Sequence, residues 1–170
     1  MAGNTSADDV TIVFRSEGPE RTQALGEALA ALLRSADVIG LVGPLGSGKT
    51  CLVKGLARGL RVPPEDPVVS PTFVLAREYG GTLPLCHIDA YRLSAAEELA
   101  SLGFEERREL GAVVVIEWAG RFAELLPPET VWIELDYGEA PDQRRIVVRW
   151  PDAKRAAALA AAIGAEVGRA

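Results

Sequence analysis

The sequence is poor in the residues that several functional classes require. It holds only two cysteines and one histidine in 170 residues, and acidic residues outnumber basic ones by 24 to 18. Cys51 and Cys86 are far from any CxxC spacing, which argues against a zinc site or a disulfide and favours reduced core thiols. The formal net charge of −6 argues against extended, sequence-independent nucleic-acid binding, because such binding needs a basic face. Any role near RNA is therefore expected to be indirect.

Long apolar runs, repeats and low-complexity linkers are also missing. No run approaches the length of a membrane span, and residues 1–9 are polar and acidic, unlike a signal peptide. We therefore expect a soluble, cytoplasmic protein. Because 48% of the residues are hydrophobic, one well-filled core is feasible. The predicted organisation is a disordered N-terminus (1–9), a single domain (10–150) and an alanine-rich C-terminal helix (151–170).

The chain does contain a phosphate-binding loop, GPLGSGKT at 43–50. It follows an apolar run at 38–42 and precedes apolar residues at helical spacing in 51–60, which is the context that this motif requires. Its glycines let backbone N–H groups turn to one concave face, Lys49 adds a cation, and Thr50 adds a hydroxyl for Mg²⁺. The motif predicts a nucleoside triphosphate site whose ligands are Gly43, Pro44, Leu45, Gly46, Ser47, Gly48, Lys49 and Thr50.

The pattern around this loop predicts the fold class. A strand at 10–14 and a helix at 20–33 come before the loop, and Gly80-Gly81 marks a hairpin turn between two later strands. The stretch 112–116 is uniformly apolar and mostly β-branched, as a central strand buried on both faces should be. We expect an α/β fold with a P-loop NTPase-like, mainly parallel central sheet flanked by helices, and with an antiparallel hairpin component.

Two carboxylates are candidates for work on the phosphates. Asp89 ends the strand-like segment 85–88, and Glu117 ends the apolar strand at 112–116. In an open α/β sheet, ligands lie beyond the carboxyl ends of the strands, so both side chains are expected near the loop. One could help to hold Mg²⁺ while the other orients the attacking water, but the residues alone do not divide these roles.

The segment Ser70-Pro71-Thr72 and the lone His87 allow two interpretations each. Hydroxyls on a rigid turn suit a switch that senses the γ-phosphate, yet serine and threonine are also ordinary turn residues, and spacing alone favours the turn. An isolated histidine one residue from a strand end is interpreted as a hydrogen-bonded structural residue rather than a base. Neither segment is assigned a function from its residue types.

Five segments, in order, match one known family. They read GPLGSGKT (43–50), SPTFVLAREY (70–79), HIDAYRL (87–93), EELASLGFEE (97–106) and VIEW (115–118). Together they closely resemble the TsaE (YjeE) family, small bacterial P-loop ATPases of tRNA threonylcarbamoyladenosine biosynthesis. The resemblance covers residues 10–150, and five ordered motifs are far more specific than one phosphate-binding loop.

The resemblance implies an activity and partners. Members are similar in being compact α/β proteins that hydrolyse ATP weakly alone and associate with TsaB and TsaD, a pair that transfers threonylcarbamoyl to the N6 of an adenosine in tRNA. The chain is accordingly expected to use ATP and Mg²⁺, to act with TsaB- and TsaD-type proteins, and to meet tRNA only through them. A membrane role is not expected.

The resemblance also implies roles for the residues at the loop. Lys49 would bind the β- and γ-phosphates, and Thr50 and Glu117 would ligate Mg²⁺. Asp89 would act near the γ-phosphate, on the attacking water. Lys49, Asp89 and Glu117 are therefore the expected catalytic residues.

Further positions come from the resemblance alone. Thr72 would belong to a nucleotide-sensing switch, so the switch interpretation rises above the turn. Adenine would lie near the start of the first helix, at Pro19 and Thr22, and near the late hairpin. Cys51 stands where the family often has a hydroxyl residue, and this departure from the family pattern removes no charge. The alanine-rich tail lies outside the resemblance, so its role is unassigned.

Two other functions remain open from the residues. A small-molecule kinase would need an acceptor pocket and usually an arginine-bearing lid, and no insertion between 90 and 115 is long or basic enough to suggest one. A nucleotide-gated binding module would need ATP occupancy but not hydrolysis. Each differs from an ATPase in the fate of the γ-phosphate, which makes them separable by experiment.

Overall fold

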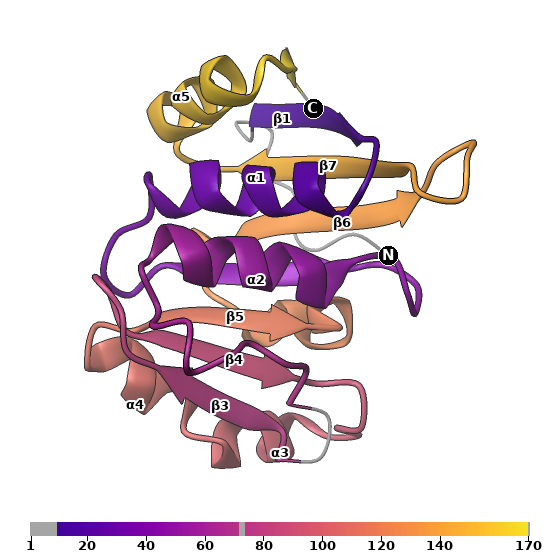
Figure 1. The fold of residues 1–170 in the computed structure, drawn as a ribbon. Coiled ribbons are helices and arrows are strands. Elements are labelled where there is room, and N and C mark those ends of the chain that lie inside the picture. Colours follow the sequence, from indigo (N-terminus) through magenta and orange to yellow (C-terminus); the bar gives the residue numbers. More distant parts are fainter. Residues whose placement is uncertain (1–9, 72–73, 170) are drawn as a thin grey trace.

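The computed structural model describes residues 10–71 and 74–169 and is built on one eight-stranded sheet. The expected disordered segment 1–9 and Thr72 therefore lie outside the described residues. The strands in chain order are β1 (Val10–Ser16), β2 (Val38–Val42), β3 (Ala76–Tyr79), β4 (Leu85–Asp89), β5 (Val113–Glu117), β6 (Val131–Tyr137), β7 (Arg144–Trp150) and β8 (Glu166–Arg169). Across the sheet their order is β3-β4-β5-β2-β6-β7-β1-β8 (Figure 1).

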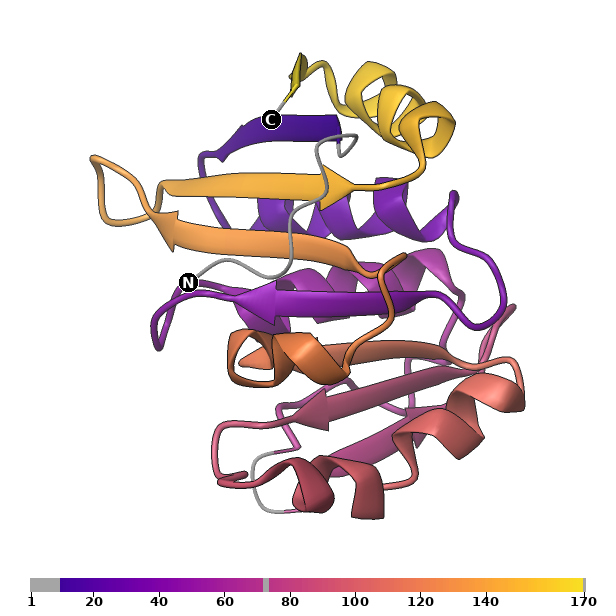
Figure 2. The same ribbon diagram turned by 180° about the vertical axis from the view of Figure 1, so that it is seen from behind.

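Helices cover both faces of this sheet. They are α1 (Pro19–Ala30), α2 (Lys49–Gly59), α3 (Ala96–Ser101), α4 (Phe104–Glu109), the 3-10 helix η1 (Ala119–Leu125) and α5 (Ala153–Ile163). Figure 1 shows α1 and α2 on one face, and Figure 2 shows α3, α4 and η1 on the other. Among the helices of residues 10–71 and 74–169, none combines the length and the apolar character needed to traverse a bilayer.

The centre of the sheet is parallel and its margins are antiparallel. β4, β5, β2 and β6 are neighbours that run in the same direction. β3 pairs antiparallel with β4 around the predicted Gly80-Gly81 turn, and β7, β1 and β8 extend the other side in antiparallel pairs. The predicted fold class, a mainly parallel α/β sheet with an antiparallel component, is confirmed.

Side chains of successive strand residues alternate between two separate cores. On β5, Val113 and Val115 pack with the core beneath α1, α2 and α5, while Val114 and Ile116 pack with the core beneath α3, α4 and η1. All five β5 residues are buried, as the apolar run predicted. The same alternation puts Glu117, which follows Ile116, on the α2 side of the sheet.

Helices α1 and α2 lie unusually close together because glycines face each other across the contact. A Cβ built on Gly26 would come within 2.5 Å of the carbonyl oxygen of Leu52, and one on Gly55 within 2.1 Å of that of Gln23. A side chain at either position would force the helices apart. This close approach brings the first turn of α1 beside the first turn of α2.

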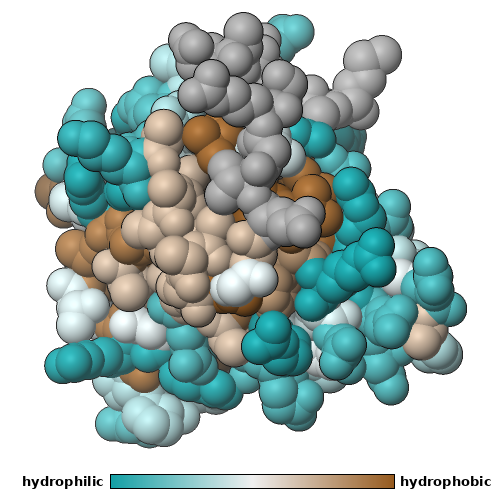
Figure 3. All heavy atoms as spheres, turned by 90° about the horizontal axis from the view of Figure 1, so that it is seen from above, coloured by the Kyte–Doolittle hydropathy of each residue, from teal (hydrophilic) through white to brown (hydrophobic). Residues whose placement is uncertain are grey.

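The C-terminal tail differs from the predicted helix over 151–170. Helix α5 is capped by Asp152, whose side chain accepts the N–H groups of Lys154 and Arg155, and it ends at Ile163. Gly164 then takes a left-handed φ of 66°, a conformation that suits glycine and stops the helix. The chain continues as β8 along β1, so a helix-favouring composition is overridden by a free sheet edge. Figure 3 shows weakly apolar surface over this end, where α5 exposes alanines.

Candidate nucleotide-binding site

The loop at 43–50 has a backbone that only glycine allows at its key points. Gly43, Gly46 and Gly48 have φ values of 147°, 77° and 104°. A Cβ on Gly43 would also come within 2.1 Å of the carbonyl oxygen of Leu135. Gly48 is the N-cap of α2, so the loop ends at a helix N-terminus that favours negative charge. The loop thus has the conformation expected of a phosphate cradle.

Lys49 is almost completely buried and points back into the loop. Its Nζ donates to the carbonyl oxygens of Gly43 and Pro44, both at 2.8 Å, and lies 3.8 Å from the centre of the Trp118 ring. Burial lowers the pKa of the Lys49 ammonium from its ordinary value, and the carboxylates of Glu117 and Asp89 offset part of that effect. A cation is thereby held at the loop by neutral acceptors.

Glu117 is buried at the end of β5, directly beneath the start of α2. Its Oε1 accepts a hydrogen bond from Thr50 Oγ1 at 2.8 Å and another from His87 Nε2 at 2.8 Å. The carboxylate can only accept, so the proton of the second contact is on Nε2 of the ring. Thr50 and Glu117, predicted together as metal ligands, are therefore adjacent in the structure.

Asp89 is the register partner of Glu117 on the neighbouring parallel strand. Residues 87 and 89 of β4 and 117 of β5 share one face of the sheet because side chains alternate along each strand. Asp89 Oδ2 accepts from Ser70 Oγ at 2.8 Å, and Oδ1 accepts from the backbone N–H of Tyr91 at 3.0 Å. The two strand-end carboxylates thus meet at the phosphate loop, as the topology argument predicted.

One cavity of about 420 Å³ contains these groups. Loop residues and the first residues of α2 form one wall, and the opposite wall carries the two carboxylates and two aromatic rings. The lining residues are Leu45, Gly46, Gly48, Lys49, Thr50, Cys51, Ser70, Asp89, Tyr91, Glu117 and Trp118. Ser47, also predicted to bind nucleotide, is fully buried, and within the described residues its Oγ has no hydrogen-bond partner.

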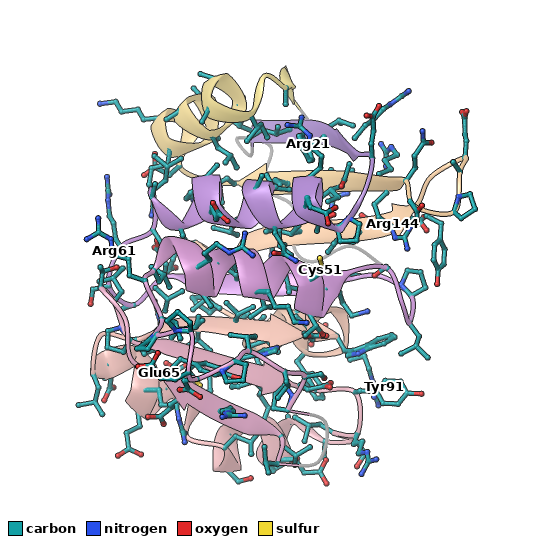
Figure 4. The ribbon with its side chains drawn as sticks, viewed as in Figure 1. Arg21, Cys51, Arg61, Glu65, Tyr91 and Arg144 are labelled. Atoms are coloured by element: carbon teal, nitrogen blue, oxygen red, sulfur yellow. The ribbon has the colours of Figure 1, made fainter. Side chains whose placement is uncertain are left out.

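Trp118 and Tyr91 form an aromatic wall that the residue types did not reveal. Trp118 has a φ of 64°, a strained conformation for a bulky residue, and its ring centre lies 4.9 Å from that of Tyr91. The Trp118 ring contacts the Lys49 ammonium, and Tyr91 lies at the loop end of the sheet (Figure 4). The adjacency of Trp118 to Glu117 was the available signal.

The hairpin between β6 and β7 holds the phosphate loop from outside. Tyr137 Oη donates to the carbonyl oxygen of Leu45 at 2.5 Å, and Arg144 Nε donates to that of Ser47 at 3.2 Å. The Arg144 guanidinium also lies 5.1 Å from the centre of the Tyr137 ring. Arg144 was not a predicted site residue, and nothing in its sequence neighbourhood signals a contact almost a hundred residues away.

A second cavity, of about 410 Å³, lies beside this hairpin. Its lining comes from the end of β1 and the following turn (Arg15, Ser16, Glu17) and from the hairpin (Tyr137, Gly138, Glu139, Gln143, Arg144, Arg145). Because Tyr137 and Arg144 also contact the phosphate loop, this cavity and the phosphate cavity are neighbours. The late hairpin is the region where the family resemblance placed adenine.

The two predicted adenine residues at the start of α1 do not line either of these cavities. Pro19 is exposed, and its carbonyl oxygen accepts from Cys51 Sγ at 3.5 Å. Thr22 is buried, and its hydroxyl is 2.8 Å from Ser16 Oγ. Their proposed contact with a base stays a prediction. Thr72 lies outside the described residues, although its neighbour Ser70 contacts Asp89.

A divalent cation fits the donor set at Thr50 and Glu117. Two ligands at right angles on octahedral Mg²⁺, each about 2.0–2.1 Å from the ion, lie about 2.9 Å apart. Thr50 Oγ1 and Glu117 Oε1 are 2.8 Å apart. Among the described residues no three His, Cys, Asp or Glu side chains could hold a metal by themselves. Phosphate and water oxygens would therefore complete the coordination, as is usual for Mg²⁺.

Comparisons with known proteins show which proteins this chain is similar to. A family model described as "Threonylcarbamoyl adenosine biosynthesis protein TsaE" matches residues 16–147. The tRNA threonylcarbamoyladenosine biosynthesis protein TsaE of Treponema pallidum is 42% identical over 120 residues, which cover 71% of this chain and 87% of the relative. The protein of the same name from Bacillus subtilis is 39% identical over 134 residues, covering 78% and 82%.

The fold leads to the same group. The crystal structure of Bacillus subtilis YdiB superimposes with a TM-score of 0.70 and 30% sequence identity, covering 91% of this chain and 94% of that one. The matched residues 16–147 include the phosphate loop, Asp89 and Glu117. Family model, relatives and fold therefore concur: this chain belongs to the TsaE family.

Proposed function

We propose that the chain is a weak Mg²⁺-dependent ATPase of tRNA threonylcarbamoyladenosine biosynthesis that acts with TsaB- and TsaD-type proteins. The observation that carries the proposal is one cavity in which Lys49, Thr50, Asp89 and Glu117 converge. Family membership supports the pathway, since the relatives are named for it. The four residues also have the chemistry that phosphoryl transfer to water needs: a cation, a metal-binding pair and a carboxylate near the attacking water.

Binding of the polyphosphate begins at the loop and the start of α2. Backbone N–H groups and the helix dipole attract the phosphates, and the buried Lys49 ammonium supplies a full positive charge. To reach the phosphates, Lys49 exchanges its carbonyl contacts with Gly43 and Pro44 for phosphate oxygens. The exchange is favourable because charge-assisted hydrogen bonds are stronger than those to neutral acceptors.

Thr50 and Glu117 would hold Mg²⁺ together with phosphate and water oxygens. The cation neutralises charge on the phosphates when it is bound. Glu117 is suited to this part because it is buried at a strand end and is fixed by its contact with His87. Thr50 is suited because its hydroxyl already lies against the same carboxylate oxygen.

Asp89 is the group proposed to act on the attacking water. Ser70 and the Tyr91 N–H each bond one of its carboxylate oxygens, so its orientation is held from two sides. A fixed carboxylate beside the phosphates can orient water and accept its proton as the water oxygen bonds to the γ-phosphorus and the bond from that phosphorus to the β–γ bridging oxygen breaks, which releases ADP. Ser70 links this carboxylate to the segment that contains the proposed switch residue Thr72.

The second cavity is proposed to take the nucleoside. It lies next to the phosphate loop and is bordered by the Tyr137 ring, the Arg144 guanidinium and polar side chains of the hairpin. A planar aromatic group and a guanidinium suit stacking against a base, and neighbouring polar groups suit hydrogen bonds to its edge. The proposed contacts of Pro19 and Thr22 would then be at the margin of the base rather than around it.

Partners, rather than the chain itself, are proposed to hold tRNA. The net charge of −6 disfavours an extended interface with the phosphate backbone. TsaB- and TsaD-type proteins would therefore bring the substrate, and this chain would contribute ATP hydrolysis. The cytoplasm is the proposed location, and it is consistent with the two unpaired cysteines, Cys51 and Cys86.

Phosphate release measured with and without the purified TsaB–TsaD pair tests the enzyme proposal. We expect slow release from the chain alone, dependence on Mg²⁺, and an increase when the pair and tRNA are present. Absence of ADP formation under every partner condition would refute the ATPase. The Glu65→Gln variant is a suitable control because Glu65 is exposed and lies away from the loop (Figure 4).

The two alternative functions give different results in matched experiments. γ-Labelled ATP should yield label in inorganic phosphate, whereas a kinase would place it on a nucleoside or sugar acceptor. Asp89→Asn keeps the size of the side chain and should abolish both hydrolysis and repeated rounds of tRNA modification. Retention of multi-round modification without hydrolysis would instead identify a nucleotide-gated binding module.

A further inference from the structure

His87 is fully buried on β4 between the phosphate site and the core. Its Nε2 donates to Glu117 Oε1 at 2.8 Å, a diagonal contact between neighbouring parallel strands. Thr50 Oγ1 donates to the same oxygen at 2.8 Å. Both contacts therefore restrain one oxygen of the carboxylate that also faces the phosphate loop.

The other ring nitrogen shows how the histidine is held. Nδ1 is buried and has no hydrogen-bond partner among the described residues. The only polar contact of the ring within that part of the chain is therefore with Glu117. A buried polar side chain that directs its one hydrogen bond at a site carboxylate is better explained by that bond than by general core packing.

We propose that His87 is a positioning residue that holds Glu117 in the orientation needed to bind the divalent cation, an inference that rests on the proposed function. Glu117 has several rotatable bonds, and without the His87 donor only the Thr50 hydroxyl, among the described residues, would restrain its carboxylate, which leaves more orientations open to it. The Nε2–H donor selects one orientation before the cation arrives. Removing this donor should weaken binding of the cation more than binding of the nucleotide, because His87 does not line the phosphate cavity.

A matched pair of variants isolates the hydrogen bond from the volume of the ring. His87→Gln retains an N–H donor at about the reach of Nε2, whereas His87→Met has almost the same shape without a donor. We would measure binding of a fluorescent ATP analogue as Mg²⁺ is raised from an EDTA baseline. His87→Met should need about 10- to 100-fold more Mg²⁺ for its half-maximal effect, and His87→Gln should need only a few-fold more.

The baseline in EDTA separates this inference from a general loss of binding. Both variants should bind the analogue within about twofold of the unaltered chain there, because the loop and Lys49 are unchanged. Equal Mg²⁺ requirements for His87→Met and the unaltered chain would overturn the inference alone. If the unaltered chain bound no nucleotide, the proposed function would fail and this inference with it.

A second measurement needs no substitution at the buried position. His87 is the only histidine in the sequence, so ¹⁵N-histidine labelling gives a single imidazole spectrum. We expect the ring proton on Nε2, and we expect that signal to shift when Mg²⁺ is added to the nucleotide-bound protein but not when EDTA is present. The Glu117→Gln variant should lose the Mg²⁺-dependent shift. A ring signal that does not shift with Mg²⁺ in the unaltered protein would overturn the inference and leave His87 with a purely structural role.

Discussion

The parallel half of the sheet (β4, β5, β2 and β6) and the antiparallel half (β7, β1 and β8) contribute differently to the candidate site. β4, β5, β2 and β6 run in one direction, so their carboxyl ends meet at one edge, where Asp89, Glu117 and the phosphate loop converge. β7, β1 and β8 alternate in direction, and α5 packs against them. Only strands of the same direction can bring their carboxyl ends to one edge, so the candidate site lies in the parallel half.

The antiparallel half supports the site from outside the phosphate cavity. It supplies Arg144, which bonds the loop carbonyl of Ser47, and it packs against α5, whose Arg155 pairs with Asp37 just before β2. Substitutions of the site residues in the parallel half should therefore lower activity at little cost in stability. Substitutions in the antiparallel half should do the reverse, except at the hairpin that touches the loop.

The largest expected effect is at Lys49. Lys49→Ala removes the cation proposed to contact the phosphates and should lower the rate of phosphate release by about 100-fold or more. Urea denaturation should show a native-like free energy of unfolding, because the buried ammonium is partly disfavoured by desolvation. Lys54→Ala, on the exposed side of α2, is the control and should keep the full rate. A Lys49→Ala protein that releases phosphate at the unaltered rate would contradict the proposal that hydrolysis takes place in the parallel half.

The largest expected effect on stability is at Arg155 of α5, the helix that packs against the antiparallel half. Its guanidinium pairs with Asp37 at 2.5 Å and Asp152 at 2.9 Å and lies 4.9 Å from the centre of the Trp150 ring. Arg155→Met leaves Asp37 largely buried without its partner and should lower the free energy of unfolding by about 2–4 kcal/mol. The change is measured by urea denaturation, and nucleotide affinity in the folded protein should not change.

Arg34→Ala is the matched control for that prediction. The Arg34 side chain is 70% exposed and lies 3.8 Å from Asp152, so its loss should change the free energy of unfolding by at most about 0.5 kcal/mol. If Arg155→Met weakened nucleotide binding as well as lowering the free energy of unfolding, the proposed division between a nucleotide-binding parallel half and a stabilising antiparallel half would be wrong.

Alkaline pH should lower the free energy of unfolding through a thiol of the parallel half. Burial raises the pKa of the Cys86 thiol on β4 from 9.0 to about 11. The folded state therefore holds the thiol proton more tightly, and its contribution is complete below pH 9 and is lost as pH rises through about 11. About 2–3 kcal/mol of the free energy of unfolding should disappear across that window.

Denaturation curves at several pH values measure this loss directly. Cys86→Ala should flatten the dependence on pH between 9 and 11, whatever its effect at neutral pH. Cys51→Ala, at a partly exposed position, should retain the slope of the unaltered chain. A slope that persists in Cys86→Ala would assign the alkaline sensitivity to another group.

The smallest expected effect is at the contact between the halves. Arg144→Gln removes the guanidinium that bonds the loop carbonyl of Ser47, and the loop should become less well ordered before nucleotide binds. Affinity for an ATP analogue should fall by about 3- to 10-fold, as expected for one hydrogen-bonding side chain. Arg61→Gln is the control because Arg61 lies at the opposite end of the sheet (Figure 4). Equal affinities for the two variants would show that the hairpin does not support the loop.

Local patterns in the sequence were enough to predict the parallel half. The loop motif, the apolar run before it and the helical spacing after it depend on neighbours within about ten residues. The strand-end positions of Asp89 and Glu117 follow from the end of each apolar run, and the register of β4 with β5 places the two carboxylates side by side. These features were predictable because side-chain alternation is local and because parallel strands present their carboxyl ends at one edge of the sheet.

The contacts that depend on distant parts of the chain were not predictable. His87 was interpreted as a hydrogen-bonded structural residue because it is an isolated histidine, and its partner Glu117, 30 residues away, was not identified. Arg144 was missed because its contact with Ser47 spans 97 residues. The tail was predicted as a helix over 151–170, but residues 166–169 instead pair with the free edge of β1 as β8.

The sequence by itself determined that a phosphate loop, two strand-end carboxylates and a mainly parallel sheet would form. Only the tertiary structure decided which groups restrain them: His87 on Glu117, Ser70 on Asp89, and Arg144 on the loop. The physical reason is that hydrogen-bond partners are chosen by proximity in the packed fold, whereas strand direction, turn geometry and burial are already encoded in short stretches of residues.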